Sequence, residues 1–227
     1  METVLVIRSC KSDMSSYNGF IWPTSGHVSA TDWEPTNECG NGLHGFLWGE
    51  GDGNLGDHSP DSKWLVVSVK ESDIIDLSGK VKFPEGDVVF CGTRYEATEY
   101  LKNNGGAGRA IIGGTSISGY KGTSTSGDYG TSTSGDYGTS TSGYYGTSTS
   151  GNKGKSTSGD YGTSTSGYKG TSTSGDSGTS TSGEGGIIHI KWYDGKRYRI
   201  VTGYVGEEGI EANVAYVVVD GKLTKKV

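Results

Sequence analysis

Cys39 and His44 are the side chains of this chain whose types and spacing come nearest to catalytic or metal-binding chemistry. A cysteine close to a histidine can begin a zinc site or form a thiol–imidazole pair that acts as a nucleophile. No second cluster of cysteine and histidine follows at ligand spacing, and Cys39 lies in a turn rich in Gly and Asn. We therefore expect a turn that packs on Trp48, without a role in catalysis or zinc binding.

The polar loop Gly49–Ser62 contains carboxylates that could supply oxygen ligands to calcium. The candidate ligands are Asp52, Asp57 and Asp61. The loop lacks the spacing of a helix–loop–helix calcium site and the glutamate that closes such a site. We expect a solvated loop and no metal site.

The remaining candidates for chemistry are isolated histidines and a set of aromatic residues. His27 and His58 have no ligand-type neighbours in the sequence, and His189 alternates with two isoleucines, so it should face solvent on its strand. Four tryptophans could line a pocket, although core packing is the usual role of such residues: Trp22, Trp33, Trp48 and Trp64. No nucleophile elbow, phosphate-binding loop or recognisable carboxylate pair is present, so we expect neither an enzyme nor a cofactor.

Nine tandem copies of the octapeptide Gly-Thr-Ser-Thr-Ser-Gly-x-x run from Gly114 to Gly185 without insertion or deletion. A Gly/Ser/Thr linker of this composition could be disordered, but a flexible linker has no reason to keep an unbroken register. So short a unit must take its hydrogen bonds from neighbouring copies. Thr favours the pleated backbone, and Gly is expected to supply the unusual dihedrals of the corners. The repeat therefore predicts a β-solenoid.

The last position of each copy predicts how many copies close one coil. Tyr129, Tyr145 and Tyr161 occupy it in successive even copies, whereas every lysine at this position falls in an odd copy. A two-sided coil of sixteen residues gathers the three tyrosines into one ladder at a spacing that permits stacking. The sequence predicts this coil.

Alternation places the Thr side chains of each copy on one side of the strand and the Ser side chains on the other. Lys155 replaces one Thr, and a lysine in a thin core would be costly, so we expect Ser inside and Thr outside. Ile117 replaces another Thr and argues the other way, unless it plugs the end of the solenoid.

On this model one face carries an unbroken ladder of threonines: Thr131, Thr133, Thr147, Thr149, Thr163, Thr165, Thr179 and Thr181. The opposite face is interrupted by Lys155. A regular surface of hydroxyl and methyl groups could bind ice, a polysaccharide or a second copy of the chain. The alternative is that Thr is simply a soluble strand-forming residue. The Thr ladder and the Tyr129, Tyr145 and Tyr161 corner are the candidate binding residues.

The sequence divides into three segments: a small α+β domain over 1–113, the solenoid over 114–185 and a β-hairpin cap over 186–227. In the first, strands are expected at Thr3–Arg8, Trp64–Val69 and Val88–Cys91, and a helix at Thr93–Asn103. In the cap, Asp194-Gly195 and Asp220-Gly221 each predict a hairpin turn. The expected fold is mainly β, and the cap would cover the unpaired edges of the last coil.

The net charge of −6 and a pI near 5.2 argue against a nucleic-acid-binding protein. No stretch is long enough to span a bilayer, and the N-terminus has no visible signal peptide. The three cysteines leave at least one unpaired, which favours free thiols in a cytoplasmic or virion-associated protein.

The Tyr-Gly-Thr-Ser-Thr-Ser-Gly units resemble the repeats of bacterial ice-nucleation proteins and the Thr-x-Thr rows of insect antifreeze solenoids. That resemblance implies outward Thr ladders that order water. Most of the chain also resembles uncharacterised bacterial and phage proteins that have a small N-terminal domain, short Gly-Asp-Tyr-Gly repeats and a Trp-x-Asp-Gly C-terminal segment. The matching pieces here are Cys39-Gly-Asn-Gly-Leu-His44 and Trp192-Tyr-Asp-Gly195. The second resemblance implies no established activity.

The function that these observations predict is that of a non-enzymatic structural or interaction protein, encoded by a phage or a bacterium. A rigid solenoid would serve as a spacer, a virion accessory or an inhibitor that docks on a host protein, and its partner would be another protein or its own copies. The alternative is an ice- or carbohydrate-binding protein that uses the Thr face. A third hypothesis, an enzyme in the N-terminal domain, depends only on Cys39 and His44.

Overall fold

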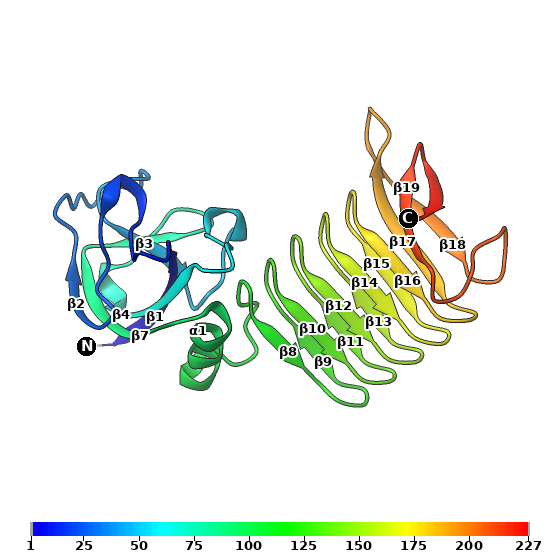
Figure 1. Cartoon of the computed structure of the whole chain (residues 1–227), viewed down its shortest axis with the longest axis horizontal. Helices are drawn as coiled ribbons and strands as arrows, with labels where there is room; N and C mark the ends of the chain where they lie inside the picture. The colour runs from blue at the N-terminus through cyan, green and yellow to red at the C-terminus, as the bar shows by residue number, and fades with distance from the viewer. Residues whose placement is uncertain (1, 227) are drawn as a thin grey trace. The chain divides into compact units, whose positions relative to one another are not determined.

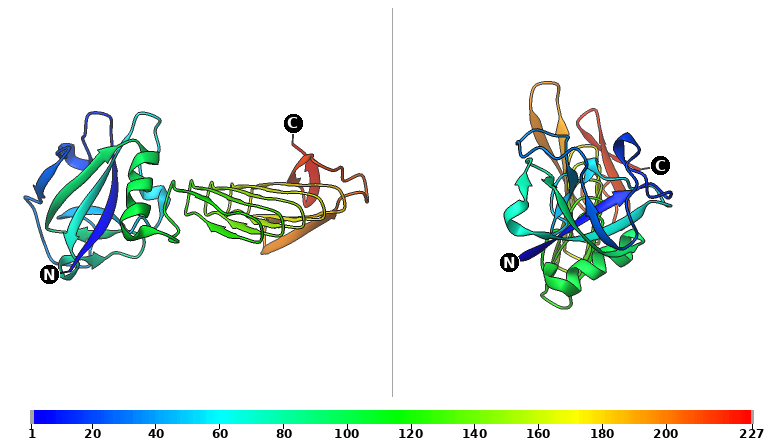
Figure 2. Two further views of the ribbon diagram at one scale, coloured as in Figure 1. Left: turned by 90° about the horizontal axis from the view of Figure 1, so that it is seen from below. Right: turned by 90° about the vertical axis from the view of Figure 1, so that its left-hand side faces the viewer.

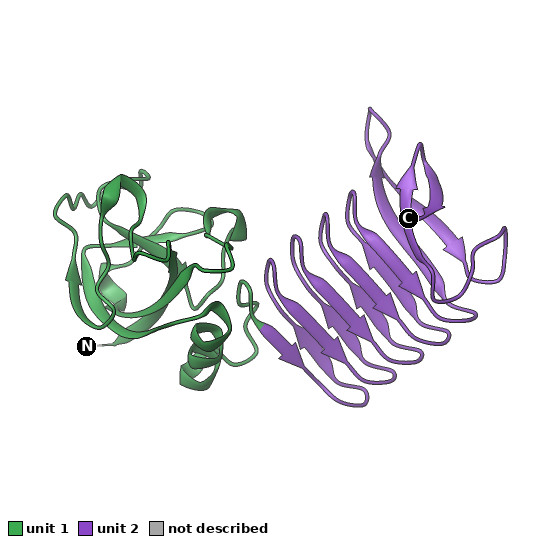
Figure 3. Ribbon diagram, in the orientation of Figure 1, with its two compact units in different colours: residues 1–114 green, residues 115–227 purple. Residues whose placement is uncertain are grey.

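The computed structural model describes residues 2–226, which form two compact units, Met1–Gly114 (unit 1) and Thr115–Val227 (unit 2). Figure 3 distinguishes them by colour. The repeat and the C-terminal hairpins lie together in unit 2. The architecture is mainly β, as the sequence predicts.

Unit 1 is a seven-stranded antiparallel sheet with the strand order β2-β7-β4-β1-β3-β6-β5 (Figure 1). Its strands are β1 (Thr3–Cys10), β2 (Gly26–Ser29), β3 (Leu43–Leu47), β4 (Lys63–Lys70), β5 (Ile75–Asp76), β6 (Val81–Phe83) and β7 (Glu85–Gly92). The three strands expected from the sequence are confirmed as β1, β4 and β7. Strands β2, β3, β5 and β6 are not among those that the sequence predicted.

The predicted helix is confirmed as α1 (Arg94–Leu101), which begins with a capping box at Thr93. It packs on one face of the sheet, where Trp64, Leu101 and Ile112 belong to one buried apolar cluster. The other face has its own cluster, which includes Val6 and Phe83. Alternate residues of β1 therefore enter two different cores.

Unit 2 stacks the repeats into two sheets whose repeat strands pair in parallel. The first sheet contains β8 (Thr115–Ile117), β10 (Thr131–Ser134), β12 (Thr147–Ser150), β14 (Thr163–Ser166) and β16 (Thr179–Ser182). The second contains β9 (Thr123–Thr125), β11 (Thr139–Thr141), β13 (Lys155–Thr157), β15 (Thr171–Ser174) and β17 (Ile187–Tyr193). Thr131 pairs with Thr147, and Thr147 with Thr163, so the sixteen-residue coil is confirmed.

Serine fills the interior of the solenoid, which confirms the predicted orientation. From Ser124 to Ser182, both Ser positions of every copy are at most 4% exposed. Interior hydroxyls bond across the coil: Ser140 Oγ donates to Ser132 Oγ at 2.9 Å, and Ser148 Oγ to Ser142 Oγ at 2.9 Å. Ile117 is 77% exposed in the same outward row as Thr133, so it is not an end plug.

The corners correct the expected role of glycine. The left-handed backbone lies at the eighth residue of each copy, for example Tyr145 (φ 52°) and Lys153 (φ 52°). Among the repeat glycines only the last, Gly185, has a positive φ. Most of the others lie where a Cβ would not fit. A Cβ on Gly159 would lie 2.7 Å from the carbonyl carbon of Gly143 in the neighbouring coil, and one on Gly154 would lie 2.7 Å from Ser150 Cβ across the same corner. Glycine here permits close stacking rather than an unusual dihedral.

Both C-terminal hairpins are confirmed (Figures 1 and 2). Strand β17 pairs with β18 (Tyr198–Tyr204), and β19 (Ala215–Val219) pairs with β20 (Lys222–Lys225) and with β16. Ile188 and Ile190 continue the interior Ser columns and are fully buried with Val205 and Tyr216. The interior thus changes from hydroxyl to apolar side chains at the last coil.

Candidate functional site

The outward side chains of β8, β10, β12, β14 and β16 form a surface that we call the Thr face. Its two rows hold the predicted ladder residues in register from coil to coil. Neighbouring strands lie about 4.8 Å apart, and alternate residues along a strand about 6.6 Å apart. Because Thr is branched at Cβ, its χ1 angle is restricted and its hydroxyl and methyl groups hold fixed directions. The face is a regular array of small amphipathic groups.

One end of the Thr face is covered. Thr179 is only 7% exposed, and Lys226 Nζ donates a hydrogen bond to its Oγ1 at 3.1 Å. Thr131 and Thr147 are exposed, and Thr181 is half-buried. Sequence reasoning assigned all eight ladder residues equally. It could not show that β19 and Lys226 contact the final coil. The open part of the array therefore ends before Thr179.

The opposite face carries a cation and is less regular. Lys155 occupies the position of Thr139 and Thr171 in the neighbouring strands and is exposed. Further along the same sheet His189 replaces a Thr, and its Nδ1 lies 3.0 Å from Thr202 Oγ1. Burial and, second, the charge of Lys155 lower the pKa of His189. This face therefore differs from the Thr face in both charge and shape.

The predicted tyrosine ladder is formed. Tyr129 and Tyr145 stack at 5.3 Å between ring centroids, and Tyr145 and Tyr161 at 5.1 Å. Tyr144 lies edge-on to Tyr145 at 4.5 Å, a contact that the sequence did not predict. Tyr145 and Tyr161 remain 47% and 49% exposed. These residues make an exposed aromatic stack along one corner.

The other corner combines lysine and tyrosine. Lys153 Nζ lies 5.2 Å from the centroid of the Tyr137 ring and donates to Tyr137 OH at 3.1 Å. This hydrogen bond raises the pKa of Lys153. Aspartate and asparagine at the seventh position connect successive coils: Asp136 Oδ1 accepts from the backbone N–H of Asn152 at 2.7 Å. These contacts hold the corners in register.

In unit 1, the contacts of Cys39 are not those of a zinc ligand or of a thiol–imidazole pair. The thiol is exposed and accepts a hydrogen bond from Lys80 Nζ at 3.0 Å, and residues 2–226 show no hydrogen bond between Cys39 and His44. Trp48, expected beside Cys39, lies 5.2 Å from the Arg109 guanidinium. All three cysteines are free, and the described residues contain no group of three or more metal-ligating side chains.

The acidic loop uses its carboxylates to order its own backbone. Asp52 Oδ1 accepts from Asn54 N at 3.0 Å, and Asp57 Oδ1 from Ser59 N at 2.9 Å. The hydrogen bonds from Ser59 lower the pKa of Asp57. In the same loop His58 Nε2 lies 2.8 Å from the carbonyl oxygen of Gly53. These are the contacts of a structured turn.

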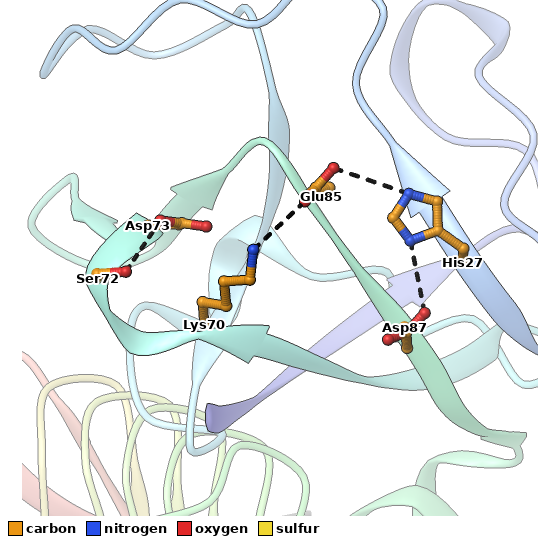
Figure 4. Close-up of polar contacts among 6 residues, drawn as sticks. All are labelled: His27, Lys70, Ser72, Asp73, Glu85 and Asp87. Atoms are coloured by element: carbon orange, nitrogen blue, oxygen red, sulfur yellow. Dashed lines mark hydrogen bonds and ion pairs between the residues drawn. The ribbon is translucent and has the colours of Figure 1, made fainter. Parts of the chain in front are cut away.

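His27 is not isolated in the structure. Figure 4 shows it between two carboxylates of the neighbouring strand, with ring nitrogens 3.8 Å from Glu85 and 3.5 Å from Asp87. Lys70 reaches the same Glu85 at 3.8 Å. All these side chains are exposed, so the ion pairs contribute little to stability. Sequence reasoning missed this group because β2 was not predicted.

None of the helices formed by residues 2–226 is long and apolar enough to cross a membrane.

Comparison with known proteins finds one domain model and a group of relatives. Residues 4–103 match the model of a domain of unknown function (DUF7666). The chain is also similar to ice nucleation proteins from Pseudomonas fluorescens, with 42% identity over 105 residues, and from Xanthomonas campestris pv. translucens, with 37% over 107 residues. The matches cover 45% and 46% of this chain but only 9% and 7% of those relatives.

Ice nucleation protein InaU of Pantoea ananas is 36% identical over 103 residues, which are 44% of this chain and 10% of that protein. This chain thus spans about a tenth or less of the length of these relatives. No solved structure shows significant similarity to it.

Proposed function

We propose that unit 2 binds ice through the Thr face. The observation that carries the proposal is the pair of Thr rows, in register over successive coils, on a solenoid whose interior is serine. The similarity of part of the chain to ice nucleation proteins supports it. We therefore favour ice binding over a docking or spacer role. The comparisons do not test the docking or spacer role, which stays a prediction.

The Thr face has the properties that ordering of water requires. Its hydroxyl groups are donors and acceptors at repeated positions, and its methyl groups lie between them. Fixed χ1 angles mean that little side-chain entropy is lost when water binds in an ordered layer. The face carries no charged residue from Thr131 to Thr165, so no ion competes for the hydration layer.

The size of the Thr face favours adsorption to existing ice over nucleation by a single chain. Its five strands extend roughly 20 Å along the stack, because neighbouring strands lie about 4.8 Å apart. The number of water molecules that such a face can order grows with the number of coils. We therefore expect ice growth to be inhibited or reshaped, with little effect on the temperature at which clean droplets freeze.

The test is partition of the full chain into slowly growing ice, with one variant on each face. Thr147→Tyr places a ring in the middle of the Thr face. Thr139→Tyr places the same ring beside Lys155 on the opposite face and serves as the matched control. We expect the wild type and Thr139→Tyr to enter ice and Thr147→Tyr to remain in the liquid. Exclusion of all three proteins, or equal uptake of the two variants, would contradict the proposal.

A further inference from the structure

Unit 1 contains a cavity of about 470 Å³ that has no part in the ice-binding proposal. Strands β1 and β3 and the loops before β3 and β6 contribute its walls, which include Arg8, Cys39, His44 and Lys80. The volume lies within the range of small-molecule sites. None of its lining residues is a carboxylate, so every formal charge on the wall is positive.

Arg8 is half-buried, and its guanidinium has no carboxylate partner among residues 2–226. Its NH1 group donates to the backbone oxygen of His44 at 2.7 Å, and its guanidinium carbon lies 4.8 Å from the centroid of the Trp22 ring. Its Nε–H is buried with no hydrogen-bond partner, and no carboxylate in residues 2–226 pairs with it. Burial lowers the pKa of Arg8. A buried donor on an unpaired cation is costly, so an anion that reached it would be bound favourably.

Two further groups add donors or positive charge to the same cavity. Lys80 Nζ donates a hydrogen bond to the thiol of Cys39 at 3.0 Å. His44 Nε2 is buried and has no partner. Lys82, which lies opposite His44 on the neighbouring strand β6, is fully buried, and its ammonium donates to the backbone oxygen of Glu38 at 2.9 Å. Burial, followed by the charges of Lys80, Arg8 and Lys82, lowers the pKa of His44 to about 4.

Lys70, Lys102 and Arg109, three other basic residues of unit 1, each pair with a carboxylate. Arg109 NH1 lies 2.9 Å from Glu50, and Lys102 Nζ lies 2.6 Å from Glu99. The lack of a carboxylate is therefore a local feature of the cavity and does not reflect a shortage of acids, since the chain has a net charge of −6. The apolar part of the wall includes Phe46, which is buried, and Leu55, which is 53% exposed.

We propose that this cavity binds a small organic oxyanion. The anionic group would be held by Arg8 and Lys80, and the apolar part of the molecule would pack against Phe46 and Leu55. Arginine presents several N–H donors in a plane, a geometry that suits both carboxylate and phosphoryl groups. The site lies wholly within unit 1, so it is independent of the ice-binding proposal for unit 2.

Calorimetric titration of the full chain with phenyl phosphate, benzoate and inorganic phosphate tests the proposal. We expect at least one of the two aromatic probes to bind, and more tightly than inorganic phosphate, because the ring adds contact with the apolar wall. Tighter binding of phenyl phosphate would indicate a phosphoryl ligand, and tighter binding of benzoate would indicate a carboxylate ligand. Failure of all three probes to bind at millimolar concentration would overturn the proposal.

Variants then locate the site. Arg8→Gln and Lys80→Gln should each weaken binding of the better probe about tenfold or more, as expected for loss of a charged hydrogen bond. Arg109→Gln removes the same type of charge outside the cavity and should leave the affinity unchanged. Lys80→Gln alters a residue near the surface, so it remains informative if Arg8→Gln fails to fold. Equal affinity of Lys80→Gln and the wild type would contradict the assignment.

Discussion

The serine interior allows two chemically identical substitutions to have opposite effects. Ser148 and Ser156 are both fully buried at the same position of neighbouring copies. Ser148 Oγ bonds to Ser142 Oγ at 2.9 Å and to the backbone oxygen of Thr157 at 2.6 Å, so it connects the two sheets. Ser156 Oγ has no hydrogen-bond partner. Replacement of each by alanine therefore removes the same atom from different environments.

Ser148→Ala should lower the free energy of unfolding of the solenoid by about 1–3 kcal/mol, because it removes both contacts of a buried hydroxyl and leaves Ser142 Oγ without this partner. The Thr157 oxygen keeps its hydrogen bond from the backbone N–H of Ser142. Ser156→Ala should be neutral or should raise it by up to about 1 kcal/mol, because the variant no longer desolvates an unpaired hydroxyl. Both variants leave the same small void, so the difference between them isolates the hydrogen bonding.

Amide hydrogen exchange of the full chain, read at β12 and β13, measures this difference locally. It is preferable to a single melting temperature because repeats can open in part. Faster exchange in Ser148→Ala and unchanged or slower exchange in Ser156→Ala is the expected result. Equal effects of the two substitutions would refute the description of the interior as a specific hydroxyl network.

Two further predictions concern the corners and unit 1. Ser177→Gly should raise the free energy of unfolding by about 0.5–1 kcal/mol, because Ser177 has φ 55°. Gly154→Ala should lower it by more than about 2 kcal/mol, because its Cβ would lie 2.7 Å from Ser150 Cβ across the corner. Urea unfolding checks both, and a stabilised Gly154→Ala would contradict the tight packing of the corner. Because the pKa of His44 is lowered from 6.5 to about 4, an unfolded chain takes up a proton between these values while the folded chain does not. The free energy of unfolding of unit 1 should therefore fall by about 2 kcal/mol as the pH decreases from 6.5 to 4, an amount that already allows for the partial exposure of His44. Calorimetric melting measures this loss, and His44→Gln should lack it.

The solenoid could be predicted in detail because its information is local and repeated. The alternation of Thr and Ser, the single Lys155 and the positions of Tyr129, Tyr145 and Tyr161 together specify the period and the inward side of each strand. The corner dihedrals were predicted less well. Composition suggests glycine as the left-handed residue, but the close contact between coils reserves glycine for positions where a Cβ does not fit.

The cavity of unit 1 could not be predicted from the sequence, because its residues come from distant segments. Arg8 lies on β1, His44 on β3 and Lys80 before β6, and β3 has no clear alternation of polar and apolar residues. Sequence analysis did consider Cys39 and His44 as zinc ligands or a thiol–imidazole pair, and it favoured a turn without either role. In the structure they lie on the wall of one cavity, where Cys39 bonds to Lys80. The fully buried Lys82 likewise gave no signal.

The ice-binding proposal is tested most directly by the thermal hysteresis of the full chain, measured together with the shape of the ice crystal. We predict a gap between melting and freezing that grows with protein concentration, facets on the crystal, retention of both in Thr139→Tyr and loss of both in Thr147→Tyr. Round crystals and no gap at millimolar protein, or an undiminished gap in Thr147→Tyr, would contradict the assignment of ice binding to the Thr face.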